Sequence, residues 1–448
     1  MYLSDSLIDQ ITQSLMVKIQ QGEFPPNTRL PSVRKHAQIL GVSNETVLRA
    51  YDKLVVLGYL EAKRGSGFYV LTTDEISPKQ NQSKKWLQQN PNVELWQKTL
   101  YEHDLTDQTD HIEIPEHKKN AVSFIQDALQ HLQVNCLNAL TQYANPQGYL
   151  PLREQLALKL KRQGISTHSE NIICTNGAAD ALHLVIWAHF FPSQAIVVEC
   201  PSIPLHVQRS LASGMEIYRV TRLEDGPDLD ELKTICEKYK PKALLMSSLL
   251  HNPTSSCLSV YKAHQLLKMA EQYDFIIIDD DTYGDLVPPQ DMLNITRLAN
   301  LDQFNRVIQI GSFSKTLSAG LRSGYIAANN KVIQHILLYK SVGAIQSPIL
   351  TDAIVAHILE HQDYEAHCQQ LAAHYNTVAT ATRQKLIDLG WNIPETKAGM
   401  YLWGSVDDQD EFQPVLDATE SLQLTYTPGS IFFSRSNQLQ PFARFNLD

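Results

Sequence analysis

The chain has 448 residues, of which 43% are hydrophobic and 19% charged, a balance typical of a folded protein. This length predicts about three structural units of roughly 150 residues each and excludes a single small module. The formal net charge of −10 disfavours adhesion of the whole molecule to nucleic acid or to anionic membranes. Residues 1–71 are the exception, with eight Lys and Arg against six Asp and Glu, so nucleic-acid contacts should be local to this segment.

The six cysteines and the N-terminus indicate the compartment. Neither a C-x-x-C pair nor a His/Cys ligand spacing occurs, so we predict free thiols, no metal and no disulfide framework. Asp5 and Asp9 occupy a region where a signal peptide needs basic and then apolar residues. Apolar runs such as 275–278 are much shorter than the roughly 20 residues of a membrane span. We therefore expect a cytoplasmic protein without a membrane partner.

The first segment, residues 1–72, combines helical and strand-like patterns. Apolar residues recur at helical spacing in three stretches, and two short β-like runs flank a basic, glycine-rich tip at 63–67. The predicted elements are helices over 4–21, 32–40 and 43–57 and strands over 59–62 and 68–71. Helices followed by a hairpin in this order predict a winged helix-turn-helix.

The remainder of the chain divides into a linker and a large domain. Residues 73–120 are poor in apolar residues and are interpreted as a linker. Over 121–448, apolar runs alternate with helical patterns, which predicts an α/β domain with a mostly parallel sheet covered on both faces. Sheets of this kind bind ligands at the carboxyl ends of their strands. Strands are expected over 195–199, 243–247, 275–279, 307–310 and 324–328.

Three motifs connect the first segment to a known family. They are Arg29-Leu-Pro-Ser-Val-Arg34, Leu40-Gly-Val-Ser-Asn-Glu-Thr-Val47 and Gly65-Ser-Gly67-Phe68. The segment resembles the DNA-binding domain of GntR-type bacterial regulators, which implies a double-stranded DNA operator as partner. The third helix is expected to read base edges, and neighbouring basic residues to meet phosphates. The expected base-reading residues are Asn44, Glu45, Thr46 and Arg49, and the expected phosphate contacts are Arg34, Lys35, Lys63 and Arg64.

A lysine follows directly on one of the predicted strands of the large domain. It lies in Ser312-Phe-Ser-Lys315-Thr-Leu-Ser-Ala-Gly-Leu-Arg322, and the preceding strand ends in three adjacent carboxylates at 279–281. Adjacent carboxylates are costly unless one of them has a cationic partner. The pattern resembles fold-type I pyridoxal-phosphate enzymes of aminotransferase class I/II. This resemblance implies a seven-stranded, mostly parallel sheet and pyridoxal 5′-phosphate as the cofactor.

The same resemblance assigns roles to residues spread over more than 300 positions. Lys315 matches the catalytic Schiff-base lysine, and Asp280 the partner of the pyridinium nitrogen. Arg444 matches the arginine that binds the α-carboxylate of an amino acid. Tyr143 matches the tyrosine that completes the phosphate site of the partner subunit, which implies a homodimer. The phenolic oxygen of the cofactor is assigned to Tyr283 and Asn252, and its phosphate to Ala178, Ala179, Ser312 and Arg322.

The sequence departs from the family patterns at a few positions. Asn44 stands where the GntR family usually has arginine, which suggests a different base preference. Ile203 replaces an aromatic residue that commonly stacks on the cofactor ring, and Ser255 replaces a glycine. We expect cofactor binding to survive both changes, whereas efficient transamination is less secure. The chain ends four residues after Arg444, where relatives usually continue into a last helix, so we expect a truncation.

A winged helix, a linker and an aminotransferase-like domain, in this order, resemble the MocR subfamily of GntR regulators. The resemblance implies a regulator that senses pyridoxal phosphate, or an amino acid or amine, through aldimine exchange at Lys315. Two alternatives stay open. The chain could be a working aminotransferase that carries a DNA-binding domain, or a DNA-binding protein with a vestigial, empty pocket. Each motif residue alone is also compatible with an ordinary turn, helix start or surface charge.

Overall fold

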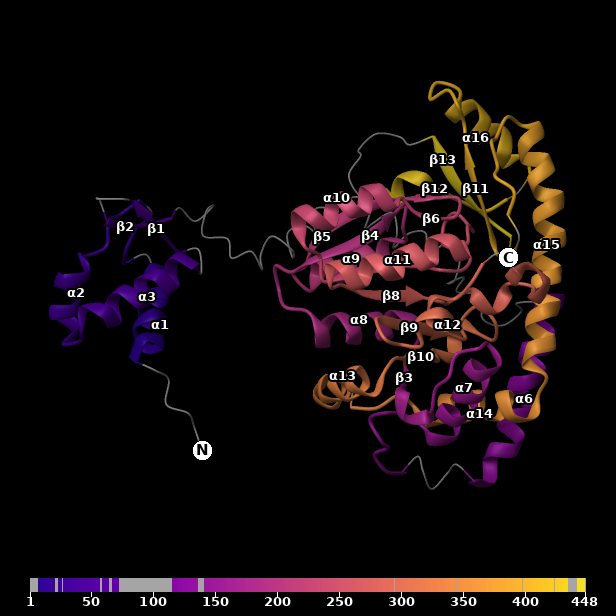
Figure 1. Ribbon diagram of the computed structural model, residues 1–448, viewed down its shortest axis with the longest axis horizontal. Helices are drawn as coiled ribbons and strands as arrows, with labels where there is room; N and C mark the ends of the chain where they lie inside the picture. The colour runs from indigo at the N-terminus through magenta and orange to yellow at the C-terminus, as the bar shows by residue number, and fades with distance from the viewer. Residues whose placement is uncertain are drawn as a thin grey trace. The chain divides into compact units, whose positions relative to one another are not determined.

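The computed structural model divides the chain into two units, residues 1–89 and 90–448, which are described separately (Figure 1). The structure describes residues 7–20, 23–25, 27–56, 59–63, 67–71, 115–135, 141–293, 295–343, 345–396, 398–422, 424–433 and 441–447.

The N-terminal unit is a three-helix fold with a short hairpin, as the sequence predicts. Its elements are α1 (Leu7–Gln20), α2 (Val33–Leu40), α3 (Asn44–Val56), β1 (Leu60–Lys63) and β2 (Gly67–Val70). The side chain of Ser32 caps α2 by accepting from the amide of Lys35, and Gly41 ends this helix at φ +67°. One face of α3 is fully buried against α1 and the hairpin, with Val47, Ala50, Tyr51 and Leu54.

The large unit contains an eight-stranded sheet in the order β3-β10-β9-β8-β7-β4-β5-β6. Strands β9, β8, β7, β4 and β5 pair in parallel, while β10 is antiparallel to both of its neighbours. The mostly parallel sheet is therefore confirmed. Its eighth strand is the two-residue β6, which extends the edge antiparallel to β5. The strands are β3 (Ile172–Thr175), β4 (Ala195–Cys200), β5 (Glu216–Leu223), β6 (Gly226–Pro227), β7 (Ala243–Met246), β8 (Ile276–Asp280), β9 (Val307–Ser312) and β10 (Gly324–Ala327).

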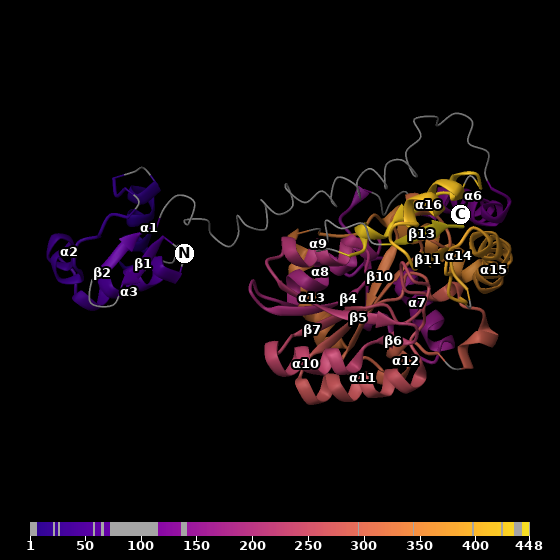
Figure 2. The ribbon, with the colours of Figure 1, turned by 90° about the horizontal axis from the view of Figure 1, so that it is seen from above.

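Helices cover both faces of this sheet because its strands bury side chains alternately on two sides. In β8, for example, Ile277 packs into one core cluster and Ile278 into the other. Figure 2 shows α8, α9 and α13 on one side and α10, α11 and α12 on the other. The α-helices of this part of the large unit are α6 (Lys119–Asn135), α7 (Leu150–Arg162), α8 (Ala178–His189), α9 (Pro204–Ala212), α10 (Leu229–Tyr239), α11 (Val260–Tyr273), α12 (Leu298–Asp302), α13 (Asn330–Gly343) and α14 (Ile349–His361).

The C-terminal part adds a small antiparallel sheet with its own hydrophobic cluster. Its order is β11-β13-β12, and the long helix α15 packs against it. The elements are α15 (Tyr364–Asp388), β11 (Tyr401–Ser405), α16 (Phe412–Glu420), β12 (Tyr426–Pro428) and β13 (Phe442–Asn446). In the described part of the chain no helix has the length and apolar character needed to cross a membrane, and the five cysteines found there form no disulfide.

Tyr51 of α3 contacts both α2 and the residue Pro31 that precedes it. Its hydroxyl donates to the carbonyl oxygen of Pro31 (2.9 Å) and lies 2.6 Å from Nδ1 of His36. We expect Tyr51→Phe to reduce the free energy of unfolding of the N-terminal unit by about 1–3 kcal/mol, because the partly buried carbonyl of Pro31 loses its donor. Hydrogen–deuterium exchange of α3 in the full chain measures this effect. Unchanged protection in the variant would show that the hydroxyl does not stabilise this unit.

Candidate functional site

The strand register brings the predicted cofactor residues to one edge of the sheet. Asp280 at the end of β8 pairs with Ile310 of β9, and Asp279 pairs with Met246 of β7. Gly324 at the start of β10 pairs with both Thr175 and Ser312, the last residues of β3 and β9. The segments that follow these strand ends therefore begin side by side, which is where an open α/β sheet binds ligands.

One part of this edge is suited to bind a phosphate. Helix α8 begins at Ala178, so the amides of Ala178 and Ala179 have no acceptor within the helix. Arg322 reaches this end by donating to the carbonyl oxygen of Asn176 and to Oγ of Ser314 (3.2 Å each), and Ser314 bonds Ser312. A side chain at Gly177 would collide with the guanidinium, since its Cβ would lie 2.6 Å from Nη2 of Arg322.

The three adjacent carboxylates at the end of β8 have different partners. Asp280 accepts from Thr282 and lies 2.9 Å from Nε2 of His206, whose Nδ1 is 3.2 Å from Oγ of Ser202. Asp279 accepts two hydrogen bonds from Ser248, at 2.8 and 2.7 Å. Asp281 forms an ion pair with Arg297 (2.7 Å) and accepts from Gln309 (2.7 Å). These separate partners relieve the repulsion that the sequence indicates.

The pKa values follow from these partners. Burial, reinforced by the charge of Asp281, raises the pKa of Asp279 to about 7. Burial acts in the same direction on Asp280, but the hydrogen bonds of His206 and Thr282 outweigh it and hold the pKa of Asp280 below its ordinary value. Burial also raises the pKa of Asp281, so Asp280 is the one of the three adjacent carboxylates that stays ionised most readily.

The predicted phenolic-oxygen partners form a hydrogen-bonded chain with the predicted carboxylate-binding arginine. Nδ2 of Asn252 donates to the hydroxyl of Tyr283 (3.1 Å), and Oδ1 of Asn252 accepts from Arg444 (3.0 Å). The guanidinium of Arg444 also lies over the ring of Tyr401 (4.2 Å to the centroid), whose hydroxyl is 3.1 Å from that of Tyr283. In the described residues Nε of Arg444 is buried without a partner.

Both departures from the family pattern have structural partners. Ser255 adopts φ +55°, a conformation that glycine adopts at little cost, and its hydroxyl donates to the carbonyl oxygen of Tyr401 (2.8 Å). Ile203 packs with the cluster of Trp403, Ile431 and Phe432 beside Arg444. The serine thus ties the loop of Asn252 to β11.

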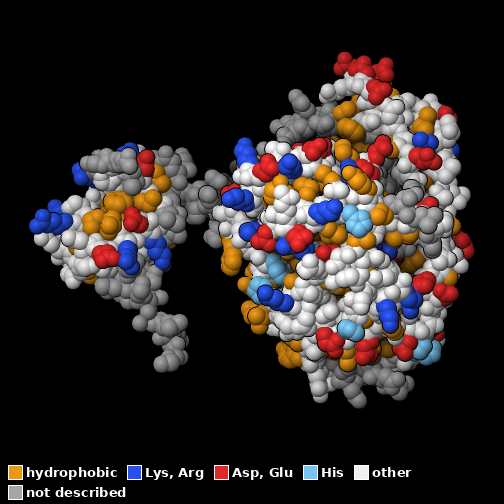
Figure 3. Space-filling view, viewed as in Figure 1, with side chains coloured by type: hydrophobic (Ala, Val, Ile, Leu, Met, Phe, Trp, Pro, Cys, Tyr) orange, Lys and Arg blue, Asp and Glu red, His pale blue; other side chains and the backbone are white. Residues whose placement is uncertain are grey.

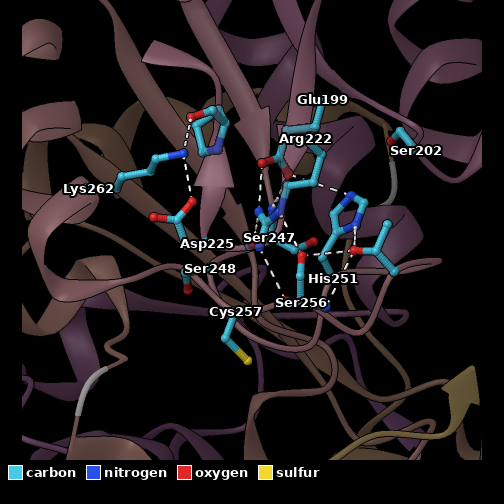
Figure 4. Close-up of polar contacts among 12 residues, drawn as sticks. Glu199, Ser202, Arg222, Asp225, Ser247, Ser248, His251, Ser256, Cys257 and Lys262 are labelled. Carbon is cyan, nitrogen blue, oxygen red and sulfur yellow. Dashed lines mark hydrogen bonds and ion pairs between the residues drawn. The ribbon is translucent and has the colours of Figure 1, made fainter. Parts of the chain in front are cut away.

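A buried ion pair fixes both ends of the loop that carries Asn252 (Figure 4). Arg222 contacts Glu199 (2.6 Å) and donates to the carbonyl oxygens of Ser247 and Ser256. Glu199 also accepts from the amide of Ser247 (3.1 Å). His251, next to Asn252, lies 3.6 Å from Glu199, and burial together with Arg222 lowers its pKa well below the ordinary value. His251 is therefore neutral.

Lys315 is half-buried, and its ammonium has no hydrogen bond or ion pair among the described residues. The next residue, Thr316, is held firmly. Its hydroxyl lies 2.8 Å from the hydroxyl of Tyr364, and its carbonyl oxygen lies 2.7 Å from Nε2 of His367. Tyr364 also bonds Asp285 (2.9 Å). The backbone of Lys315 is thus anchored while its amine stays available.

The predicted DNA-contacting residues lie at two helix starts and on the hairpin. Arg34 and Lys35 are exposed on α2, and Asn44 and Glu45 are exposed on α3. Arg49 is also exposed but pairs with Glu45 (2.6 Å), and Lys63 pairs with Glu61 (3.3 Å). Thr46 is half-buried and bonds Ser43. Arg64 lies outside the described residues. On the face in Figure 3, acidic and basic side chains of the large unit are interspersed.

Sequence reasoning missed several residues of this site. His206 lies in the first turn of α9, six residues after the carboxyl end of β4, a position that a search of every strand end would have found. Tyr401 lies on β11, Thr427 on β12 and Phe432 in the turn after β12, and Thr427 accepts from Arg444 (3.1 Å). No sequence spacing connects these residues to Arg444, because only the folding of the C-terminal sheet brings them to it.

Each of the two units is similar to a known protein family. Residues 111–446 match the family described as aminotransferase class I and II, and residues 7–70 match bacterial regulatory proteins, gntR family. The chain is 28% identical over 414 residues to the HTH-type transcriptional regulator YdfD of Bacillus subtilis, covering 88% of this chain and 83% of that protein. It is 25% identical over 453 residues to the HTH-type transcriptional regulator YdcR of Escherichia coli, covering 98% and 94%.

The fold of the large unit also occurs in solved structures. The α-aminoadipate aminotransferase LysN of Thermus thermophilus, complexed with N-(5′-phosphopyridoxyl)-L-leucine, has a TM-score of 0.66 and 21% identity, over 75% of this chain and 85% of that one. The chain therefore belongs to the aminotransferase class I and II family and begins with a gntR-family domain, which together make the MocR architecture.

Proposed function

We propose that the protein is a MocR-type transcription regulator that binds operator DNA through its N-terminal unit and pyridoxal 5′-phosphate in its large unit. The relatives of matching length are HTH-type transcriptional regulators, which supports the first half. Operator binding implies action in the cytoplasm. The proposal of cofactor binding rests on Lys315, whose amine has no partner among the described residues. It follows β9 at the sheet edge that also carries the phosphate-binding residues around Arg322 and the ionised Asp280.

The residues at this edge fit the cofactor. When bound, pyridoxal phosphate supplies an aldehyde that reacts reversibly with amines and a ring that accepts electrons. Lys315 presents the amine, Asp280 with His206 behind it offers an ionised partner for the pyridinium nitrogen, and Tyr283 and Asn252 present donors for the phenolic oxygen. Arg322 and the first amides of α8 bind the phosphate.

Arg444 is suited to bind the carboxylate of an amino acid effector. It is 5% exposed, it is held by Asn252 and Thr427, and its Nε has no partner in the described residues. A carboxylate would supply the missing acceptor. Arg444 would orient such an amino acid, and Lys315 would be the candidate base for a proton at its Cα. Such a change of charge at the sheet edge is the event that we propose the regulator senses.

We also propose a homodimer, in which Tyr143 reaches the phosphate of the partner's site. Tyr143 is 86% exposed, and Val342 and Leu338 on α13 are 81% and 68% exposed. Leu338 and Val342 are one turn apart on α13, and the amide of Ala144, next to Tyr143, donates to Oε1 of Gln346, three residues beyond the end of that helix. Exposed apolar residues grouped in this way are typical of an interface.

A working aminotransferase is the second candidate. It is favoured by the complete set of Lys315, Asp280, Tyr283 and Arg444 and by the fold shared with LysN. Steady conversion of an amino acid and a 2-oxo acid by the purified protein would support this function. A single stoichiometric half-reaction, or none, would support the regulator alone.

The first prediction concerns the lysine. We expect Lys315→Ala to lose the visible absorbance of the protein reconstituted with pyridoxal phosphate, because this variant removes the amine that has no partner among the described residues. Borohydride reduction followed by mass spectrometry should find the cofactor on Lys315 in the original chain. Lys331→Ala, which removes an exposed lysine of α13, is the control and should behave like the original. Cofactor trapped on the Lys315 variant would contradict the assignment.

The second prediction concerns DNA. Lys35→Ala should weaken binding to all duplex sequences and lower the slope of log affinity against log salt by about one, as expected for a phosphate contact. Asn44→Ala should instead change the preferred sequence. Fluorescence anisotropy at several salt concentrations measures both, with Lys331→Ala as the control. If Lys35→Ala and the control have equal salt dependence, Lys35 contacts no phosphate.

The third prediction concerns assembly. Light scattering of the cofactor-bound protein at micromolar concentration should give the mass of a dimer. Tyr143→Phe should keep this mass but bind the cofactor about tenfold or more weakly, since a hydrogen bond to a charged phosphate is lost. Tyr261→Phe alters another exposed tyrosine, on α11, and should have no effect. A monomer that holds the cofactor with full affinity would refute the shared phosphate site.

A further inference from the structure

A cluster of imidazole and carboxylate side chains lies between α6 and α14, which pack against each other in the large unit (Figure 1). Asp127 and His131 are one turn apart on α6, and His357 projects from α14. One ligand atom from each lies within 4.8 Å of the others. Nε2 of His357 is 3.0 Å from Oδ2 of Asp127, and Nδ1 of His131 is 3.3 Å from Oδ1.

These separations match a first coordination sphere. Two nitrogen or oxygen ligands at roughly 2.0–2.2 Å from a tetrahedral ion are about 3.3–3.5 Å apart. Small side-chain shifts would therefore place all three atoms around one cation. The rings of His131 and His357 stack, with centroids 4.9 Å apart and 28° between their planes. Nδ1 of His131 also lies 3.0 Å from the backbone carbonyl oxygen of Asp127, a contact that a bound cation would replace.

His357 and the carboxylate of Asp127 are held by their surroundings, whereas His131 is exposed to solvent. The side chain of His357 is 11% exposed, and Gln362 donates to Oδ2 of Asp127 (2.8 Å), which orients the carboxylate. The side chain of His131 is 63% exposed, so water can complete the coordination. The alternative is a plain ion-pair network, which the same distances permit when a histidine is protonated.

We propose that Asp127, His131 and His357 bind a divalent transition cation of the zinc type, with water in the remaining position. Two imidazoles and a carboxylate are ligands that such a cation prefers. The ion would link α6 to α14 and so add to the packing between these two helices. This site is independent of Lys315, so it stands whether or not the cofactor proposal holds.

The test uses the full chain, stripped of metal with a chelator that is then removed. Calorimetric titration with zinc sulfate should show binding to the chain at this site, and zinc should raise the melting temperature. His131→Ala removes an exposed ligand without disturbing the core and should weaken this binding by about tenfold or more. Cobalt(II) added in place of zinc should give a visible spectrum that the variant lacks.

His264→Ala is the matched control, because it removes an exposed histidine from α11 and leaves the cluster intact. It should bind zinc and cobalt like the original chain. Any zinc held by the free thiols would persist in both variants. The proposal is overturned if the stripped chain binds no zinc, or if His131→Ala binds zinc as tightly as His264→Ala and gives the same cobalt spectrum.

Discussion

Parallel pairing of β8 with β7 and β9 is the constraint on which the site depends. Because parallel strands end at the same edge, this pairing sets Asp280, the loop of Asn252 and the segment of Lys315 beside one another. Strand β10 runs the other way and pairs with β9 and β3, so Arg322, which precedes it, meets the start of α8. A register shift in any of these pairs would separate the amine from the carboxylate or from the phosphate cradle.

Buried charged side chains around this edge hold the loops that carry the site residues in place. Arg222 and Glu199 clamp the two ends of the loop that carries Asn252, while Asp285 and Tyr364 hold Thr316 beside Lys315. Asp285 is itself paired with Lys159 and Arg297, and these cations overcome the effect of burial to set its pKa at about 2. Removing one partner of such a pair leaves a buried charge uncompensated, which is strongly destabilising.

Local sequence patterns predicted the elements that are marked by a continuous apolar run, a helix cap or a tight turn. Five strands of the sheet were expected from continuous apolar runs, and β9 and β10 lie where those runs predict them. Strand β5 was missed because polar residues interrupt its apolar ones over Glu216–Leu223, and the four-residue β3 was missed although β7 and β10, of the same length, were predicted. The hairpin and the three helices of the N-terminal unit have strong turn and cap signals, and all were predicted.

The sequence by itself determined the N-terminal winged-helix unit, the mostly parallel sheet and the order of the residues that resemble a pyridoxal-phosphate site, because periodicity and motif spacing are properties of the chain. Length alone predicted about three units, whereas the structure divides into two. Tertiary structure alone decided which partners these residues have. His206 behind Asp280, Tyr401 and Thr427 around Arg444, and His357 opposite Asp127 are separated from them by 17 to 230 positions. No local pattern encodes such contacts, since they arise only when packing of whole helices and sheets closes the distance.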